Sequence, residues 1–183
     1  MARPRIFTDD EILDHLGTAL KDATGSWTLA GAAAAVGLHP ATLIKRFGSR
    51  HGLLVALSRR WVAAQPSAPA SADPYEELLS WARSSTPSGA SGTQLLARID
   101  MLAEDLRDPE LRALLRMGWR QNLLYLTSLV ERSQAAGRIS SSLPPQTAAQ
   151  LLLDAAHGAL LRSAVEPEPT GTVPIQSLLE ALT

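Results

Sequence analysis

Apolar residues recur along the chain at the spacing of helix faces, and glycine, proline and serine separate these runs. In the first run, Ile12 and Leu16 lie on one face of a helix that starts after Thr8 and ends by Gly25. Glu11 follows Thr8 by three residues, which is the pattern of a capping box. The same reasoning predicts eight more helices, over residues 29–36, 40–47, 50–64, 75–85, 93–106, 109–136, 146–165 and 174–182.

The composition favours this helical reading. Hydrophobic residues make up 45% of the 183 residues, and most of them are Leu and Ala. Few residues are aromatic or β-branched, so sheet is disfavoured. We therefore expect an all-α fold.

The segment from Thr28 to Leu57 has the most informative spacing. Two short helices are separated by Gly37, and a second break falls at Gly48 before a third apolar run. Two short helices joined by a tight turn form a helix-turn-helix, whose second helix fits the major groove of DNA. The sequence therefore predicts a DNA-binding module with residues 40–47 as its recognition helix.

This register resembles the N-terminal domain of the TetR family of dimeric transcriptional regulators. The resemblance is carried by Thr28, Gly37, Thr42, Leu43, Phe47, Leu53 and Leu54. It implies a nine-helix, two-domain architecture, with a helix-turn-helix domain over 1–48, a connecting helix over 49–64, and a ligand-binding and dimerisation domain over 65–183. The chain departs from the family pattern at Ile44, where a Tyr is usual, at His39, where Ser or Thr is usual, and at Arg50, which replaces a Lys.

Charge supports the DNA-binding prediction. Residues 1–60 hold eight Lys or Arg against five Asp or Glu, whereas residues 61–183 hold nine against thirteen. A basic module suits phosphate binding. The predicted contacts are to base edges from Pro40, Ala41, Thr42, Ile44 and Lys45, to phosphates from Thr28, Arg46 and Arg50, and to a minor groove from Arg3 and Arg5.

The resemblance also implies partners for the rest of the chain. A homodimer with its recognition helices one DNA turn apart would bind a palindromic operator on double-stranded DNA. The predicted dimer interface comprises Leu151, Leu152, Ala155, Gly158, Leu161, Ile175, Leu178 and Leu179. The predicted pocket for a small, mostly apolar inducer comprises Trp81, Ile99, Leu102, Leu115, Trp119, Leu123, Tyr125 and His157.

The sequence gives little support for catalysis, metal binding or a membrane span. There is no cysteine, the four histidines lack metal-ligand spacing, and no phosphate loop or nucleophile elbow is present. We expect no enzyme activity, no cofactor and no metal. No apolar run approaches the roughly 18 residues of a membrane span, and no secretory signal is visible, so a cytoplasmic protein is expected.

Three functions remain open. The first is a repressor that a ligand releases from its operator. The second is a ligand-independent dimeric regulator, whose C-terminal domain serves only dimerisation or protein contacts. The third is an adaptor that binds protein and has lost DNA binding. Steep salt dependence of DNA affinity would argue against the adaptor, because Lys and Arg displace counterions from DNA.

Overall fold

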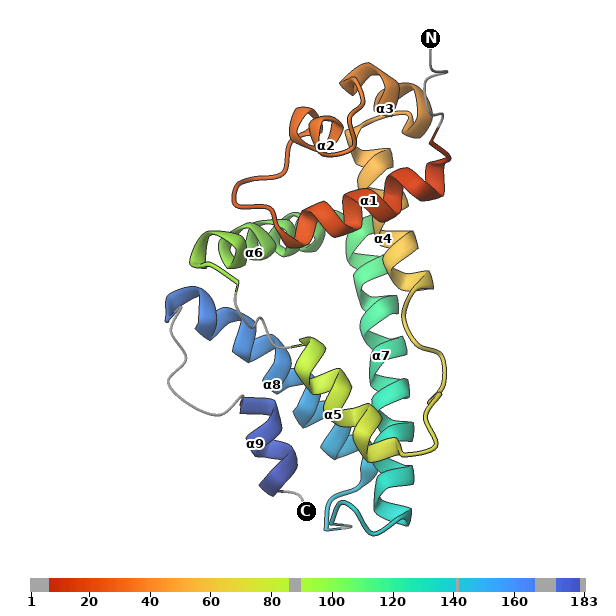
Figure 1. Ribbon diagram of the computed structural model, residues 1–183, viewed down its shortest axis with the longest axis vertical. Helices are drawn as coiled ribbons and strands as arrows, with labels where there is room; N and C mark the ends of the chain where they lie inside the picture. The colour runs from red at the N-terminus through yellow and green to blue at the C-terminus, as the bar shows by residue number, and fades with distance from the viewer. Residues whose placement is uncertain (1–6, 86–89, 141, 167–173, 182–183) are drawn as a thin grey trace. The chain divides into compact units, whose positions relative to one another are not determined.

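The computed structural model describes residues 7–85, 90–140, 142–166 and 174–181, and within these ranges it contains nine helices and no strand (Figure 1). The helices are α1 (Asp9–Lys21), α2 (Leu29–Ala35), α3 (Pro40–Phe47), α4 (Arg50–Ala63), α5 (Pro74–Ser85), α6 (Gly92–Arg107), α7 (Pro109–Ala135), α8 (Pro145–Val165) and α9 (Pro174–Ala181). The predicted all-α fold is confirmed. The later helix ends fall within about a residue of their predicted positions, but α1 ends at Lys21, short of Gly25.

Side-chain caps explain where the first helices begin. The Thr8 hydroxyl accepts from the backbone N–H of Glu11 at 3.2 Å, and the Thr8 N–H donates to the Glu11 carboxylate at 2.7 Å, which confirms the capping box. Thr28 caps α2 and Ser49 caps α4 in the same way, through Oγ atoms that accept a backbone N–H. Each cap satisfies a donor that the helix itself leaves unpaired.

The chain divides into two compact units, Met1–Ala64 with Leu96–Leu115, and Gln65–Leu95 with Arg116–Thr183. The first unit thus comprises α1 to α4 together with Leu96–Leu115, a segment that lies within the predicted C-terminal domain over 65–183. Packing accounts for this, because Leu54 and Val55 of α4 form a buried cluster with Leu111 of α7.

The core of the first unit joins α1, α2, α3 and α4. Its fully buried large side chains include Ile12 and Leu16 of α1, Leu43 of α3 and Leu53 of α4. The alanines of α2 face this core through Ala32 and Ala33. Burying each Leu or Ile contributes about 1.5–3 kcal/mol, which holds these short helices together.

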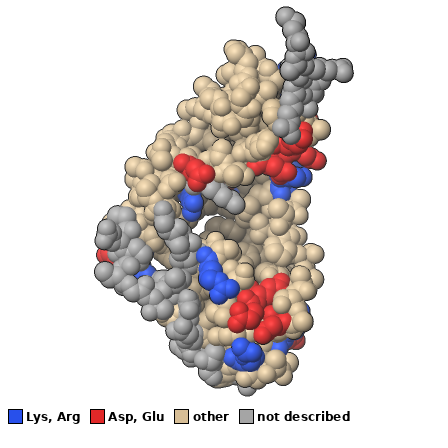
Figure 2. Space-filling model, in the orientation of Figure 1, with Lys and Arg blue, Asp and Glu red and all other residues tan. Residues whose placement is uncertain are grey.

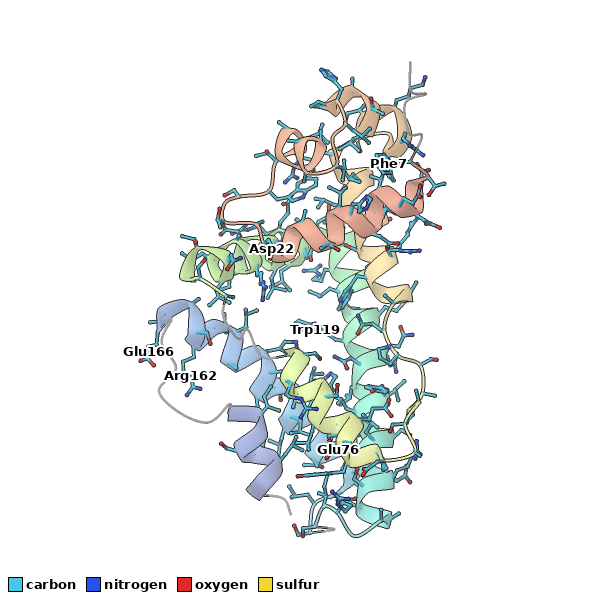
Figure 3. The ribbon with its side chains drawn as sticks, viewed as in Figure 1. Phe7, Asp22, Glu76, Trp119, Arg162 and Glu166 are labelled. Atoms are coloured by element: carbon cyan, nitrogen blue, oxygen red, sulfur yellow. The ribbon has the colours of Figure 1, made fainter. Side chains whose placement is uncertain are left out.

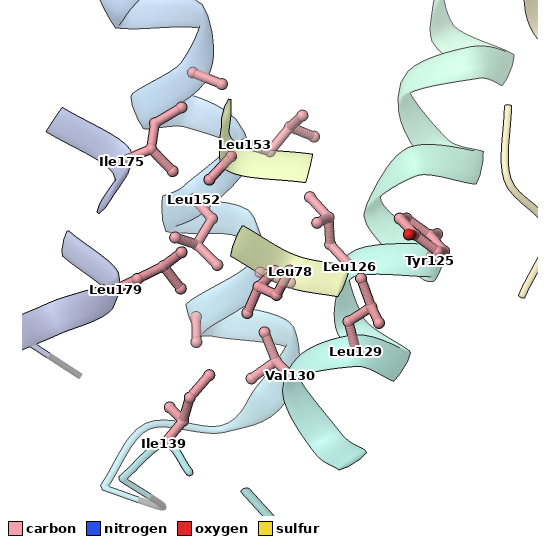
Figure 4. Packing of buried hydrophobic residues seen from close by; sticks show 14 residues of the cluster. Leu78, Tyr125, Leu126, Leu129, Val130, Ile139, Leu152, Leu153, Ile175 and Leu179 are labelled. Atoms are coloured by element: carbon pink, nitrogen blue, oxygen red, sulfur yellow. The ribbon is translucent and has the colours of Figure 1, made fainter. Parts of the chain in front are cut away.

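The core of the second unit joins α5, α7, α8 and α9, as Figure 4 shows. Its fully buried large side chains are Leu78, Leu126, Leu129, Leu152, Ile175 and Leu179. Tyr125 lies at the edge of this core, and its hydroxyl donates to Glu77 Oε1 at 2.8 Å. Glu77 also accepts the backbone N–H groups of Ala70 and Ser71, so this carboxylate ties the loop before α5 to α7.

Candidate nucleic-acid interface

A tight turn sets α3 against α2. Gly37 has a φ of 66°, a left-handed conformation that favours glycine, and the N–H of Leu38 donates back to the carbonyl of Ala33 at 2.9 Å. His39 caps α3, because its Nδ1 accepts the N–H of Ala41 at 3.2 Å. Pro40 occupies the first helical position, where its missing N–H costs nothing.

The two faces of α3 differ sharply in burial. Leu43 is fully buried and Phe47 packs against the same core, which confirms that both point inward. On the other side, Ala41, Ile44 and Lys45 are exposed, with Ile44 at 36%. Pro40 and Thr42 are partly exposed. The structure therefore gathers the five residues predicted to reach base edges on one helix, none of them buried in the core.

The close approach of α4 to α3 depends on a glycine. A Cβ atom at Gly52 would lie 2.0 Å from the backbone oxygen of Phe47, so a larger residue would force the helices apart. Gly48, with a φ of 81°, makes the turn between the two helices. The end of α3 is thus fixed by backbone geometry as well as by its buried side chains.

Arg46 lies next to Lys45 but bonds within the domain. Its Nε donates to Asp9 Oδ1 at 2.5 Å, and one of its terminal nitrogens donates to the Phe7 carbonyl at 2.5 Å. Figure 2 shows acidic and basic side chains side by side over α1. Asp9 lies 37 residues and Phe7 39 residues before Arg46 in the sequence, so the sequence did not reveal these partners.

Arg50 also bonds inside the first unit. Its guanidinium donates to both carboxylate oxygens of Glu104 on α6 and to the carbonyl of Trp27, and it lies 4.7 Å from the centre of the Trp27 ring. The hydrogen bond to Arg50 lowers the pKa of Glu104. A phosphate would have to compete with these contacts for the guanidinium.

Of the other residues predicted to contact DNA, Thr28 and Lys45 lie within the described part of the chain. The Thr28 side chain is exposed, and its oxygen caps α2. Within the described residues, the Lys45 ammonium makes no ion pair or hydrogen bond. Arg3 and Arg5 lie outside the described residues.

The predicted dimer interface separates into exposed and buried residues. On α8, Leu151 is 44% and Leu161 53% exposed, and Gly158 is exposed, whereas Ala155 is half-buried. The sequence analysis missed Val165, which is 82% exposed on the same helix. Large apolar side chains left open in this way mark a surface that can meet a partner.

Three residues of the predicted dimer interface are buried within one chain. Leu152, Ile175 and Leu179 are fully buried in the core of one chain and have no surface to offer a second copy. Leu178 is partly buried and packs against that same core. Helix α9 contacts α8 and α5, so Ile175 and Leu179 are covered within the chain.

The residues predicted to bind an inducer do not all belong to one unit. Ile99, Leu102 and Leu115 belong to the first unit, and the other five belong to the second. In the second unit, Trp119 of α7, labelled in Figure 3, stacks on His157 with ring centres 4.6 Å apart. Burial lowers the pKa of His157.

Two further polar groups predicted for the inducer pocket already have partners. Trp81 Nε1 donates to Asn122 Oδ1 at 3.2 Å, and both Trp81 and Leu123 pack against the core of the second unit. Tyr125 donates to Glu77, and burial raises the pKa of this phenol. These contacts serve the fold, so Trp119 and His157 are the remaining aromatic candidates.

A cavity of about 610 Å³ lies within the first unit, and none of the predicted pocket residues lines it. It is lined by Ser26, Trp27, Arg50, Asp100, Met101, Glu104, Arg107, Asp108 and Pro109. Nearby on α6, burial together with the charges of Glu104 and Asp108 raises the pKa of Asp105 to about 6. The lining is largely charged, unlike the apolar site that the sequence analysis expected.

The described residues form neither a metal site nor a membrane-spanning helix. In the part of the chain that the structure describes, no three His, Asp or Glu side chains are grouped as a metal site requires. None of the helices in the described ranges combines the length and apolarity needed to span a bilayer.

Neither the models of known protein families nor the sequences of curated proteins match this chain. Solved structures do match its fold. A TetR-family transcriptional regulator from Agrobacterium tumefaciens has a TM-score of 0.67 at 18% identity, covering 96% of this chain and 100% of its own. A TetR transcription regulator from Haloarcula marismortui has a TM-score of 0.66 at 15% identity, covering 94% and 93%.

A third structure, the complex of SmeT with triclosan, has a TM-score of 0.58 at 17% identity, covering 93% of this chain and 88% of SmeT. SmeT is from Stenotrophomonas maltophilia. The chain therefore has the fold of TetR-type transcriptional regulators over nearly its whole length.

Proposed function

We propose that this protein is a sequence-specific DNA-binding transcriptional regulator, with α3 as its recognition helix. The observation that carries the proposal is the division of α3 into two faces. Leu43 is fully buried, whereas Ala41, Ile44 and Lys45 are exposed on the same eight-residue helix. Such a helix can enter a major groove without leaving its own core.

The exposed side chains suit direct reading of bases. The Lys45 ammonium can donate to O6 and N7 of guanine, and the methyl groups of Ala41 and Thr42 can contact a thymine methyl. Ile44 offers further apolar contact. Thr28, the exposed cap of α2, would meet a phosphate, and this contact would fix the register of α3 without reading sequence.

A homodimer would place two copies of α3 on one operator. The exposed residues Leu151, Leu161 and Val165 on α8 support this proposal, because burying them against a second copy would remove apolar surface from water. Two half-sites about 34 Å apart, one DNA turn, would then be contacted together.

We further propose that the regulator is a repressor and that a small, mostly apolar ligand releases it from DNA. The complex of the similarly folded SmeT with triclosan supports a ligand-binding role. In this chain, Trp119 and His157 are the aromatic pair best suited to such a ligand. The alternative, a ligand-independent regulator, is favoured by the internal partners of Trp81 and Tyr125.

We propose that helix α4 transmits a shift from α6 to α3. It directly follows α3, and its ion pairs join it to α6 through Arg50–Glu104 and to the start of α7 through Arg59–Glu110. A ligand releases DNA only if it binds the DNA-incompatible state more tightly. Operator affinity that stays unchanged at ligand saturation would exclude this mechanism.

Selection of bound fragments from a pool of random duplex DNA tests the proposed function. We expect a palindrome whose half-sites are one helical turn apart, and affinity that falls steeply with salt. Recovery of no common sequence would reject sequence-specific regulation. A salt-independent interaction would favour the protein-binding adaptor.

A further inference from the structure

The side chain of Arg46, on α3, reaches back to the start of α1. Two divergent hydrogen bonds, each of 2.5 Å, leave its guanidinium for Asp9 Oδ1 and for the Phe7 carbonyl. Figure 3 labels Phe7 at the start of α1. The two acceptors lie on either side of Thr8, the residue that caps α1. Arg46 therefore binds the residue before the cap and the residue after it.

This arrangement adds a directional contact to those that already hold α3. Leu43 and Phe47 pack α3 against the core, and the Gly48 turn fixes its end, but apolar contacts are themselves non-directional. A planar guanidinium with two hydrogen bonds has a defined orientation. It fixes the end of α3 relative to α1, and hence the direction in which the exposed residues of α3 face.

We propose that Arg46 is a positioning residue, which sets the rotation of α3 so that Thr42 and Lys45 face the base edges, and that it does not itself bind a phosphate. The proposal rests on the DNA-binding function proposed above. In this role Arg46 does not make the phosphate contact that the sequence analysis predicted for it. Only 27% of the Arg46 side chain is exposed, and two of the five N–H donors of its guanidinium are bonded to the start of the domain.

The two possible roles predict opposite effects for Asp9→Asn. If Arg46 positions α3, loss of the Asp9 carboxylate loosens the helix and weakens DNA binding. If Arg46 binds phosphate and Asp9 competes for it, the substitution frees the guanidinium and strengthens binding. Asp10→Asn is the matched control, since it removes the same charge from the neighbouring residue, whose cation is Arg60 at 3.5 Å.

The experiment measures affinity, base preference and salt dependence on DNA selected by the wild-type protein. We expect Asp9→Asn and Arg46→Gln each to bind about fivefold more weakly than Asp10→Asn, which corresponds to about 1 kcal/mol. Both should lose preference at several base positions. Their combination should be no worse than Arg46→Gln alone, because Arg46→Gln already breaks the link to Asp9. The salt slope of Arg46→Gln should equal that of the wild-type protein.

Two DNA-binding results would overturn the proposal. One is tighter binding by Asp9→Asn than by Asp10→Asn. The other is a salt slope that falls in Arg46→Gln by about one for each contact removed, as loss of a phosphate contact requires. Asp9→Glu, which keeps the carboxylate, should restore base preference, and failure of this rescue would also count against the link.

Amide hydrogen exchange separates this proposal from the proposed function. Arg46→Gln should speed exchange of the α3 amides in the free protein, whereas Asp10→Asn should not. If the wild-type protein selects no DNA, the DNA-binding function fails, but exchange still tests the link. Unchanged exchange in α3 of Arg46→Gln would overturn the positioning role whatever the protein binds.

Discussion

The guanidinium of Arg50, at the start of α4, contacts both carboxylate oxygens of Glu104 on α6, although 54 residues separate them in the sequence. The same guanidinium lies over the Trp27 ring and donates to the Trp27 carbonyl. Arg50 thus joins the segment before α2, the start of α4 and the end of α6. This cation, expected from its position to contact DNA, stabilises the unit that carries the recognition helix.

Glu104→Gln should lower the free energy of unfolding by about 1 kcal/mol at pH 7, because it breaks a two-pronged but partly exposed ion pair. The pKa of Glu104 is lowered in the folded state, so the pair stabilises the fold above the ordinary pKa of a glutamate. That stabilisation is lost as the pH falls through the lowered value. Denaturant unfolding at pH 7 and pH 3 checks both statements. An equal loss in Asp100→Asn, an exposed acid on the same helix, would contradict them.

Asp105→Asn should have the opposite effect and stabilise the protein at pH 8. Burial, with the charges of Glu104 and Asp108, raises the pKa of Asp105 to about 6. The folded state then holds this proton more tightly than the unfolded state, so stability falls as the pH rises from about 4 to about 6. Partial exposure reduces the roughly 3 kcal/mol of the full shift to about 1 kcal/mol. Unfolding curves should converge for the two proteins near pH 4, and a constant difference from pH 4 to pH 8 would contradict this account.

His39→Ala should lower stability by about 0.5–2 kcal/mol, the usual range for loss of an N-cap. His39→Asn should retain most of that stability, because its side-chain oxygen can accept the Ala41 N–H that the His39 Nδ1 now accepts. Thermal unfolding of the two variants measures the difference. Equal loss in both would show that the imidazole stabilises α3 in some way other than capping.

Leu161→Glu should convert the proposed dimer to a monomer. The side chain is 53% exposed on α8, so a charge there is harmless to one chain but costly in an apolar interface. Leu124→Glu is the control, because Leu124 is 66% exposed on α7. Sedimentation velocity should show a monomer for the first variant and a dimer for the second. A dimer in both would place the interface elsewhere.

Local signals in the sequence predicted the helices and the burial pattern of α3 well. The Thr8 cap, the Gly37 turn and the Pro40 start depend on neighbouring residues, and each is found as expected. The same holds for the inward Leu43 and the exposed Ile44, because helical spacing alone decides the face on which each residue lies.

Long-range pairing could not be predicted in this way. Spacing shows that Leu152 and Ile175 are apolar, but not whether their own chain or a second copy covers them. It likewise shows that Arg46 and Arg50 are basic, but not that acids tens of residues away hold them. The sequence therefore could not predict which surface each of these side chains contacts, because that depends on how the chain packs.

The most direct test of the account compares the DNA sequences selected by the wild-type protein and by Lys45→Ala. We predict that the wild-type protein selects a palindrome, and that the variant loses preference at one base pair in each half-site while keeping the others. The expected cost at that pair is about 1–3 kcal/mol, the value of a good base contact. An unchanged base preference in Lys45→Ala would contradict the assignment of α3 as the helix that reads DNA.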